Sequence, residues 1–225
     1  MTKQNPTDTQ FAAFQNLWDY FNQALFLGVL QPVLLNFSRK ANTLGFFAPL
    51  RWERNGETTH EISLNPAYLR HREPREVVST LVHEMVHAYQ AQFGKPGRGG
   101  YHNQEWADKM EAIGLMPSST AAPGGKRTGD RVSHYIIEGG ALAQAFAAMP
   151  QEFLLPWLCW EGKEGSKKPR AASKVKFTCP ACGVNAWGRP GLLLACGACE
   201  VPMTAGAATD GDAAEADFDD ERRAA

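Results

Sequence analysis

The sequence predicts an α+β fold, in which a compact domain of helices and one small sheet precedes a small cysteine-rich module. Three observations indicate this fold. An amphipathic helix at 9–27 is followed by three strand-like runs, a second amphipathic helix carries His-Glu-Met-Val-His at 83–87, and two Cys-x-x-Cys pairs lie beyond residue 175. The expected order is a helix, a small antiparallel sheet, two helices that carry a site, and the module.

The first helix and the strands follow from hydrophobic spacing. Strand-like runs cover 33–38, 44–52 and 60–64, and Asn55-Gly56, a strong hairpin signal, lies between the last two. The apolar residues of the helix share one face: Phe11, Phe14, Trp18, Phe21 and Leu25.

The second helix separates an apolar face from a chemical one. It begins near Pro74 and ends at Gly94. His83 and His87 are four residues apart, so both imidazoles can bind one metal ion, and Glu84 can reach a metal-bound water. This pattern is typical of zinc hydrolases, usually peptidases with a zincin-like fold, and the alternative is two structural histidines. The opposite face is apolar: Val78, Leu81, Val82, Met85, Val86 and Tyr89.

A third ligand distinguishes the zinc hydrolases from one another. Metzincins would have Gly and His at the positions of Gln90 and Phe93, so their pattern fails. A thermolysin-type site would take Glu105 or Glu111. His102 is the stronger prediction, because it opens a helix at 103–113 and faces the same way as that helix's apolar stripe. Glu105 would then support a ligand or cap the helix, and the alternative for His102 is a loop histidine without a role.

The sequence also suggests parts that could serve a peptide substrate. One of the two hairpin strands is expected to be an edge strand that pairs with an extended chain. The run His60–Leu64 is favoured for this role, with His60 itself a surface residue. Residues 115–131 are expected to be a loop and 131–138 a strand. That segment could donate a hydrogen bond to an oxyanion from Arg131, His134 or Tyr135, although an ordinary structural strand is the simpler interpretation.

The C-terminal module has the spacing of a zinc ribbon. Thirteen residues separate its two pairs, Cys179 with Cys182 and Cys196 with Cys199, and each pair offers two thiolates to one structural zinc. A pair of redox dithiols is the alternative. Cys159 is left over and is expected to be a buried thiol.

A basic linker leads into this ribbon. Residues 163–176 carry a net charge of +5, and with the ribbon's exposed groups they predict contact with single-stranded or distorted DNA. The alternative is a solvated linker, with the tryptophan inside the ribbon's core. The predicted contact residues are Lys167, Lys168, Arg170, Lys174, Lys176, Trp187 and Arg189. The acidic segment 204–225 is expected to be disordered.

Composition favours an intracellular enzyme. The chain has 225 residues, 44% hydrophobic content and a formal net charge of −1, and it shows neither an apolar signal segment nor a membrane span. With four of five cysteines in a metal-type pattern, the expectation is a monomeric cytoplasmic protein that does not bind membranes.

The motifs resemble those of the SprT-like metalloproteases, which include the Spartan proteases. His-Glu-Met-Val-His-Ala-Tyr at 83–89, a glycine-rich spacer and Gly-Tyr-His-Asn-Gln-Glu-Trp at 100–106 carry the resemblance, and Trp-Gly-Arg-Pro-Gly-Leu at 187–192 extends it to the ribbon. The resemblance implies that His83, His87 and His102 bind a catalytic zinc and that Glu84 is the acid/base. It also implies a protein substrate that is attached or crosslinked to DNA.

These expectations define a domain plan and a function. The plan is a SprT-like zincin domain at 1–116, a loop-rich extension packing on it at 117–160, a linker at 161–174, a ribbon at 175–203 and a tail at 204–225. The expected function is that of a zinc-dependent endopeptidase with one catalytic and one structural Zn²⁺. One alternative is a nucleic-acid-binding regulatory protein that no longer cleaves, and another is a hydrolase of small amides.

Overall fold

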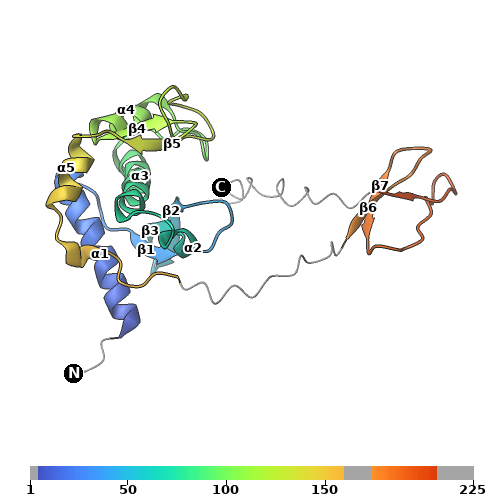
Figure 1. Cartoon of the computed structure of the whole chain (residues 1–225), viewed down its shortest axis with the longest axis horizontal. Helices are drawn as coiled ribbons and strands as arrows, with labels where there is room; N and C mark the ends of the chain where they lie inside the picture. The colour runs from blue at the N-terminus through green and yellow to red at the C-terminus, as the bar shows by residue number, and fades with distance from the viewer. Residues whose placement is uncertain (1–4, 160–173, 207–225) are drawn as a thin grey trace. The chain divides into compact units, whose positions relative to one another are not determined.

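The chain divides into two compact units, residues 1–160 and 161–225. The computed structural model describes residues 5–159 and 174–206 and confirms the α+β fold (Figure 1). The predicted linker apart from Lys174, and the predicted tail apart from 204–206, lie outside the described residues. The boundaries of the five-part plan stay a prediction.

The first helix, α1 (Pro6–Phe26), starts and stops where local chemistry dictates. Asn5 caps it by accepting a hydrogen bond from the Thr7 backbone N–H at 3.0 Å, and Leu27 ends it in the left-handed conformation at φ 58°. Of the predicted apolar face, Phe14, Trp18 and Phe21 are buried and Leu25 is partly buried, whereas Phe11 is exposed. The residues of α1 that are buried are Ala13, Phe14, Leu17, Trp18, Phe21 and Phe26.

The main sheet has three strands, β1 (Leu34–Phe37), β2 (Gly45–Arg54) and β3 (Glu57–Leu64), in the order β1-β3-β2. The predicted hairpin between β2 and β3 is confirmed, with φ at 54° for Asn55 and 85° for Gly56, as a type I′ turn requires. β1 pairs with β3 in parallel, so the sheet is mixed.

The strand order overturns one prediction. His60–Leu64 belongs to β3, which is central and paired on both sides, so it is wrong to expect an edge strand there. The reason is that β1 pairs with the edge of β3 that the hairpin leaves open, and local sequence carries no signal for such long-range pairing. Among the described residues, the edge strands of this sheet are β1 and β2.

The short helix α2 (Pro66–Leu69) leads to the long helix α3 (Pro74–Phe93), whose predicted limits are confirmed. The apolar side of α3 packs against β2, β3 and α1, and all of its predicted residues are buried except Tyr89, which is partly buried. Gly94 ends the helix in an extended conformation, with φ −123° and ψ −156°, and a Cβ there would overlap the Glu105 carboxylate. The helix therefore stops where the chain turns back toward α4 (Gln104–Ala112).

The segment after α4 is more regular than expected. The prediction of a loop at 115–131 is wrong for its first residues, because β4 (Leu115–Ser118) pairs antiparallel with β5 (Ser133–Ile136). Pro117 resembles a turn residue, but β4 pairs on one side only, so one missing N–H is tolerated.

The chain then returns to α1. Helix α5 (Ala141–Ala148) and a 3₁₀ turn, η1 (Gln151–Phe153), follow β5. Leu142 and Met149 are buried in the core, and the Tyr20 hydroxyl donates to the Ala145 carbonyl at 2.8 Å. The unit thus includes residues well beyond 116. The prediction of a buried Cys159 thiol is wrong, because this side chain is partly exposed.

The second unit is a small ribbon. Its sheet has the order β7-β6-β8, formed by β6 (Val175–Thr178), β7 (Asn185–Gly188) and β8 (Thr204–Ala205). Phe177 is its buried aromatic residue, whereas Trp187 is 64% exposed. Within the described part of the chain, no helix is both long and apolar enough to cross a membrane.

Candidate metal centres

Three histidines meet beside α3. His83 and His87 project from neighbouring turns of this helix, and His102 lies just before α4. One nitrogen from each ring lies within 4.8 Å of the others, as one metal ion requires. The structure therefore brings together the three predicted ligands.

The nitrogen spacing fits zinc. The Nε2 atoms of His87 and His102 are 3.2 Å apart. Two imidazole nitrogens bound to a tetrahedral zinc at about 2.0–2.1 Å would be separated by about 3.3 Å. An all-imidazole donor set also suits this ion. The three residues thus fit a zinc ion by both distance and chemistry.

A network of amides and carboxylates holds the loop that presents His102. Gln90 on α3 is buried and donates to Asn103 Oδ1 at 2.7 Å and to Glu105 Oε1 at 3.0 Å. Asn103 also caps α4 by accepting from the Trp106 N–H at 3.0 Å. Glu105 accepts from the Lys95 N–H at 3.0 Å. Glu105 therefore fixes the loop before α4 to the end of α3 through these hydrogen bonds.

The carboxylates considered as alternative third ligands have other partners. Glu105 accepts from Gln90, and Glu111 accepts from Arg127 at 2.5 Å. In the described residues, the metal-type group around α3 contains His102 and neither of these carboxylates. This placement favours His102 over a thermolysin-type arrangement.

A backbone carbonyl outside the metal-type group orients the ring of His102. Its Nδ1 atom lies 3.2 Å from the Gly129 carbonyl oxygen, and the two backbones exchange hydrogen bonds of 2.9 and 3.0 Å. Because a carbonyl only accepts, the proton of the neutral ring lies on Nδ1, and Nε2 keeps its lone pair. Gly129 has φ 136°, a conformation that favours glycine.

Burial keeps these imidazoles neutral. It lowers the pKa of His87 to about 3, aided by the nearby His102, and it is the main cause that lowers the pKa of His102. Burial also lowers the pKa of His83 well below its usual range, with smaller contributions from the three neighbouring histidines. Neutral imidazole is the form that binds a metal, so the rings need no deprotonation at pH 7.

Other side chains enclose the histidines. The buried Trp106 ring lies 4.3 Å from the His102 ring centroid and 4.9 Å from that of His83. Phe47 on β2 stacks on His87 at 6.4 Å. Glu84 lies between the two ligands of α3 in sequence and is 6% exposed. Aromatic rings thus enclose the three imidazoles, and a buried carboxylate follows the first of them on the helix.

The structure separates the predicted oxyanion donors. His134 is close to the metal-type group, but its two ring nitrogens contact His83 at 3.0 Å and Ser79 at 2.9 Å. Tyr135 follows it in β5 and so points to the opposite face of that strand. Arg131 is exposed. The contact between His134 and His83 was missed from sequence, since 51 residues separate them.

His60 is not part of the metal-type group. Its Nδ1 atom accepts from the Leu50 N–H at 3.0 Å, and its ring lies 5.2 Å from that of Phe47. It is half-buried rather than a surface residue.

The ribbon holds a second metal-type group, built from two matching turns. In the first, Cys179 donates its backbone N–H to Val184 and accepts from Gly183, both at 2.9 Å. In the second, Cys196 bonds in the same way with Val201 at 2.9 Å and Glu200 at 2.8 Å. The corresponding residues Gly183 and Glu200 both have positive φ, at 75° and 56°. The repeated Cys-x-x-Cys sequence therefore folds twice into one local structure.

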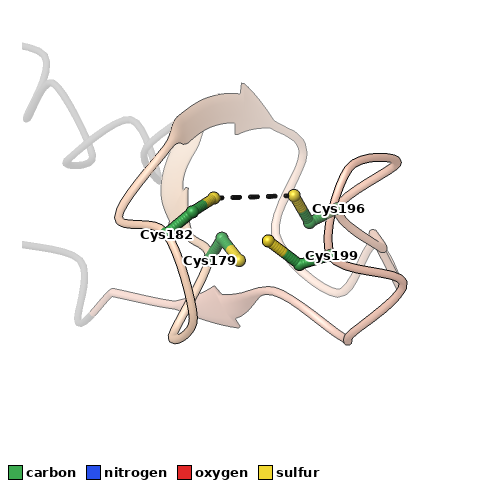
Figure 2. A group of neighbouring side chains, drawn as sticks. All are labelled: Cys179, Cys182, Cys196 and Cys199. Carbon is green, nitrogen blue, oxygen red and sulfur yellow. Dashed lines mark hydrogen bonds between the residues drawn. The ribbon is translucent and has the colours of Figure 1, made fainter.

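The four thiols point toward a common centre (Figure 2). Their sulfur atoms lie within 4.8 Å of one another, and Cys182 Sγ is 3.7 Å from Cys196 Sγ, near the roughly 3.8 Å expected for two thiolates on one tetrahedral zinc. Hydrogen bonds from the Cys199 S–H to the neighbouring sulfur atoms, first those of Cys182 and Cys196, raise the pKa of Cys199 to about 12. None of the five cysteines forms a disulfide, and four thiolates this close together would need a cation among them.

The described part of the predicted DNA contact lies at the β6-β7 hairpin of the ribbon. Lys176 pairs across the hairpin with Trp187. Phe177, the next residue of β6, points to the opposite face. Lys174 directly precedes β6 and Arg189 directly follows β7, so they would share the side of Lys176 and Trp187 if strand alternation continued by one residue. All four of these predicted contacts are exposed. The predicted contacts Lys167, Lys168 and Arg170 lie outside the described residues.

We predict that acid destabilises the zinc-free protein before its carboxylates titrate. Unfolded histidines titrate near 6.5, whereas burial lowers the pKa of His87 to about 3 and, with Arg72, that of His134 to about 4. Between these values the unfolded state binds more protons, so this stability is complete above about pH 6.5 and falls below it.

The measurement is urea unfolding of chelator-treated protein at several pH values. From about pH 7.5 to 5, each of these two histidines should lower the free energy of unfolding by about 2 kcal/mol. A His134→Asn variant should show a smaller loss than the wild type. A free energy of unfolding that stays constant over this range would contradict the neutral, buried assignment.

Comparison with known proteins agrees with this geometry. Residues 14–124 match the family model of the SprT-like family, which indicates a zinc metallopeptidase-type domain. The match contains α3, α4 and all three clustered histidines, and it ends before β5 and the ribbon. No curated protein matches the chain. Residues 14–124 therefore form a domain of the SprT-like family.

Proposed function

We propose that the protein is a zinc-dependent endopeptidase. The observation that carries this proposal is the meeting of His83, His87 and His102 beside the buried Glu84. Three neutral imidazoles leave one position of a tetrahedral metal open, which is the arrangement of catalytic rather than structural zinc. When bound, zinc would supply Lewis-acid polarisation of the scissile carbonyl and a lowered pKa for a water molecule.

Glu84 is the acid/base in this proposal. The residue follows His83 on α3, so its carboxylate projects about 100° round the helix from that ligand. Its oxygen would take a proton from the attacking water and pass it to the leaving amine. A carboxylate at the position expected for the acid/base favours cleavage over the non-cleaving regulatory alternative.

The substrate in this proposal is a polypeptide in extended form, which pairs with β2. The strand β2 pairs only with β3 among the described residues, so its other edge is open. Its Phe47 stacks on His87, which places this part of the strand beside the histidines. Backbone pairing gives affinity with little sequence preference. This suits a protease of varied proteins better than a hydrolase of small amides.

A Glu84→Gln variant tests the catalytic role. The amide cannot accept the proton, so cleavage of a DNA-bound protein should fall by about 10²–10⁴-fold. Cleavage is followed with and without single-stranded DNA, and equal zinc content in both forms is the control. Equal cleavage by wild type and variant would remove Glu84 from the mechanism. Absence of cleavage by either form, in all DNA conditions, would favour the regulatory alternative.

We propose further that the ribbon binds single-stranded or distorted DNA. Trp187 is 64% exposed, so it is not the core residue of the alternative interpretation, and that place belongs to Phe177. Lys176 pairs with Trp187 across the hairpin, and Lys174 and Arg189 flank this pair at the ends of β6 and β7. An aromatic platform among positive charges suits stacked bases and a phosphate backbone. This surface would bring the protease to proteins attached or crosslinked to DNA.

A Trp187→Ala variant tests this surface. Loss of one stacking platform should weaken binding of a single-stranded oligonucleotide by roughly 10–100-fold in fluorescence anisotropy. Leu193→Ala is the matched control, since Leu193 is 100% exposed in the same unit but carries no aromatic ring. Unchanged affinity in the Trp187 variant, or equal losses in both, would contradict the proposed contact.

A further inference from the structure

His134 contacts the metal-type group without belonging to it. It lies on β5, beyond residues 14–124, and its Nδ1 atom is 3.0 Å from the Nδ1 atom of His83. Its Nε2 atom is 2.9 Å from the Ser79 hydroxyl, and the same hydroxyl lies 2.9 Å from the Glu76 carbonyl oxygen. A chain of hydrogen bonds thus runs from the backbone of α3 through His134 to His83.

The direction of this chain follows from its first member. The Glu76 carbonyl can only accept, so the Ser79 hydroxyl gives it its single proton. The hydroxyl oxygen then accepts from His134 Nε2–H. A neutral imidazole has one donor and one acceptor, so His134 Nδ1 accepts. Its partner, His83 Nδ1, must therefore carry a proton, and His83 Nε2 keeps its lone pair.

If these hydrogen bonds ran in the opposite direction, His83 could not bind a metal. A Ser79 hydroxyl turned toward His134 would place a proton on His134 Nδ1, and His83 Nδ1 would have to accept it. The proton of His83 would then occupy Nε2. With Nδ1 already facing His134, this ring would have no lone pair left for a metal. The bond from Ser79 to the helix carbonyl prevents this arrangement.

Two ligands are thereby oriented by one segment. His102 donates Nδ1–H to the Gly129 carbonyl, and His83 donates Nδ1–H to His134, five residues further along the same chain. Both contacts come from residues beyond the family match. The segment from Gly129 to His134 thus determines which nitrogen of each ring carries the proton and which is left to bind a metal.

We infer that His134 is a positioning residue, which together with Ser79 holds His83 in the tautomer that binds zinc. This inference rests on the proposed zinc site. His134 is not a fourth ligand, because the metal-type group contains His83, His87 and His102 without His134, whose Nδ1 atom instead contacts Nδ1 of His83. It is not a simple core residue either, since both of its ring nitrogens are bonded.

Two isosteric variants separate the hydrogen bond from the volume of the side chain. In His134→Asn, the amide oxygen can still accept from His83 Nδ1–H, whereas in His134→Leu nothing can. Chelator competition on the whole chain should show that Leu weakens zinc binding at the histidine site by about 10–100-fold, and that Asn restores most of the affinity. Zinc at the four ribbon cysteines serves as the internal control and should be unchanged.

The tautomer of His83 can be measured directly, and it would not change if His134 only filled space in the core. Proton-detected NMR of the ¹⁵N-histidine-labelled chain should show His83 protonated at Nδ1 in the wild type and in the Asn variant. Equal zinc affinities of the Leu and Asn variants would overturn the inference, and so would a His83 ring that carries no proton on Nδ1. If the wild type binds zinc only at the ribbon, the proposed function is overturned as well. If it binds two zinc ions and His134→Leu leaves the zinc affinity of the histidine site unchanged, this inference alone is overturned.

Discussion

The burial of one side of α3 is the constraint on which the rest of the site depends. Leu81, Val82, Met85 and Val86 lie against the sheet and α1 with no exposed surface, and this fixes the rotation of the helix. His83 and His87 then project together from the other side. Because the same packing excludes water, it also keeps both rings neutral and ready to bind a metal.

The two metal-type groups obtain their geometry in different ways. The ribbon cysteines are placed by two local turns with the same backbone hydrogen bonds, so the sequence repeat and the structure correspond directly. The histidine group instead needs three separate segments: α3, the loop before α4 and the segment that includes β5. A small ribbon has little core of its own and suits a structural ion, whereas the enclosed histidines suit chemistry.

This difference explains what could be predicted. The limits of α3, the hairpin at Asn55-Gly56 and the grouping of His83, His87 and His102 depend on spacing within short segments, and the structure agrees with them. The central place of β3, the strand β4 and the contact of His134 with His83 depend on pairing between distant segments. No local pattern encodes such pairing, so these features could not be read from the sequence.

Anomalous diffraction at the zinc absorption edge, from crystals of the zinc-loaded protein, would test the central claim most directly. The account predicts one peak about 2.0–2.1 Å from Nε2 of His83, His87 and His102, and a second about 2.3 Å from the four ribbon sulfur atoms. His134 should lie outside both coordination spheres. A zinc-loaded crystal without a peak among the three histidines, or with His134 bound to the metal, would contradict it.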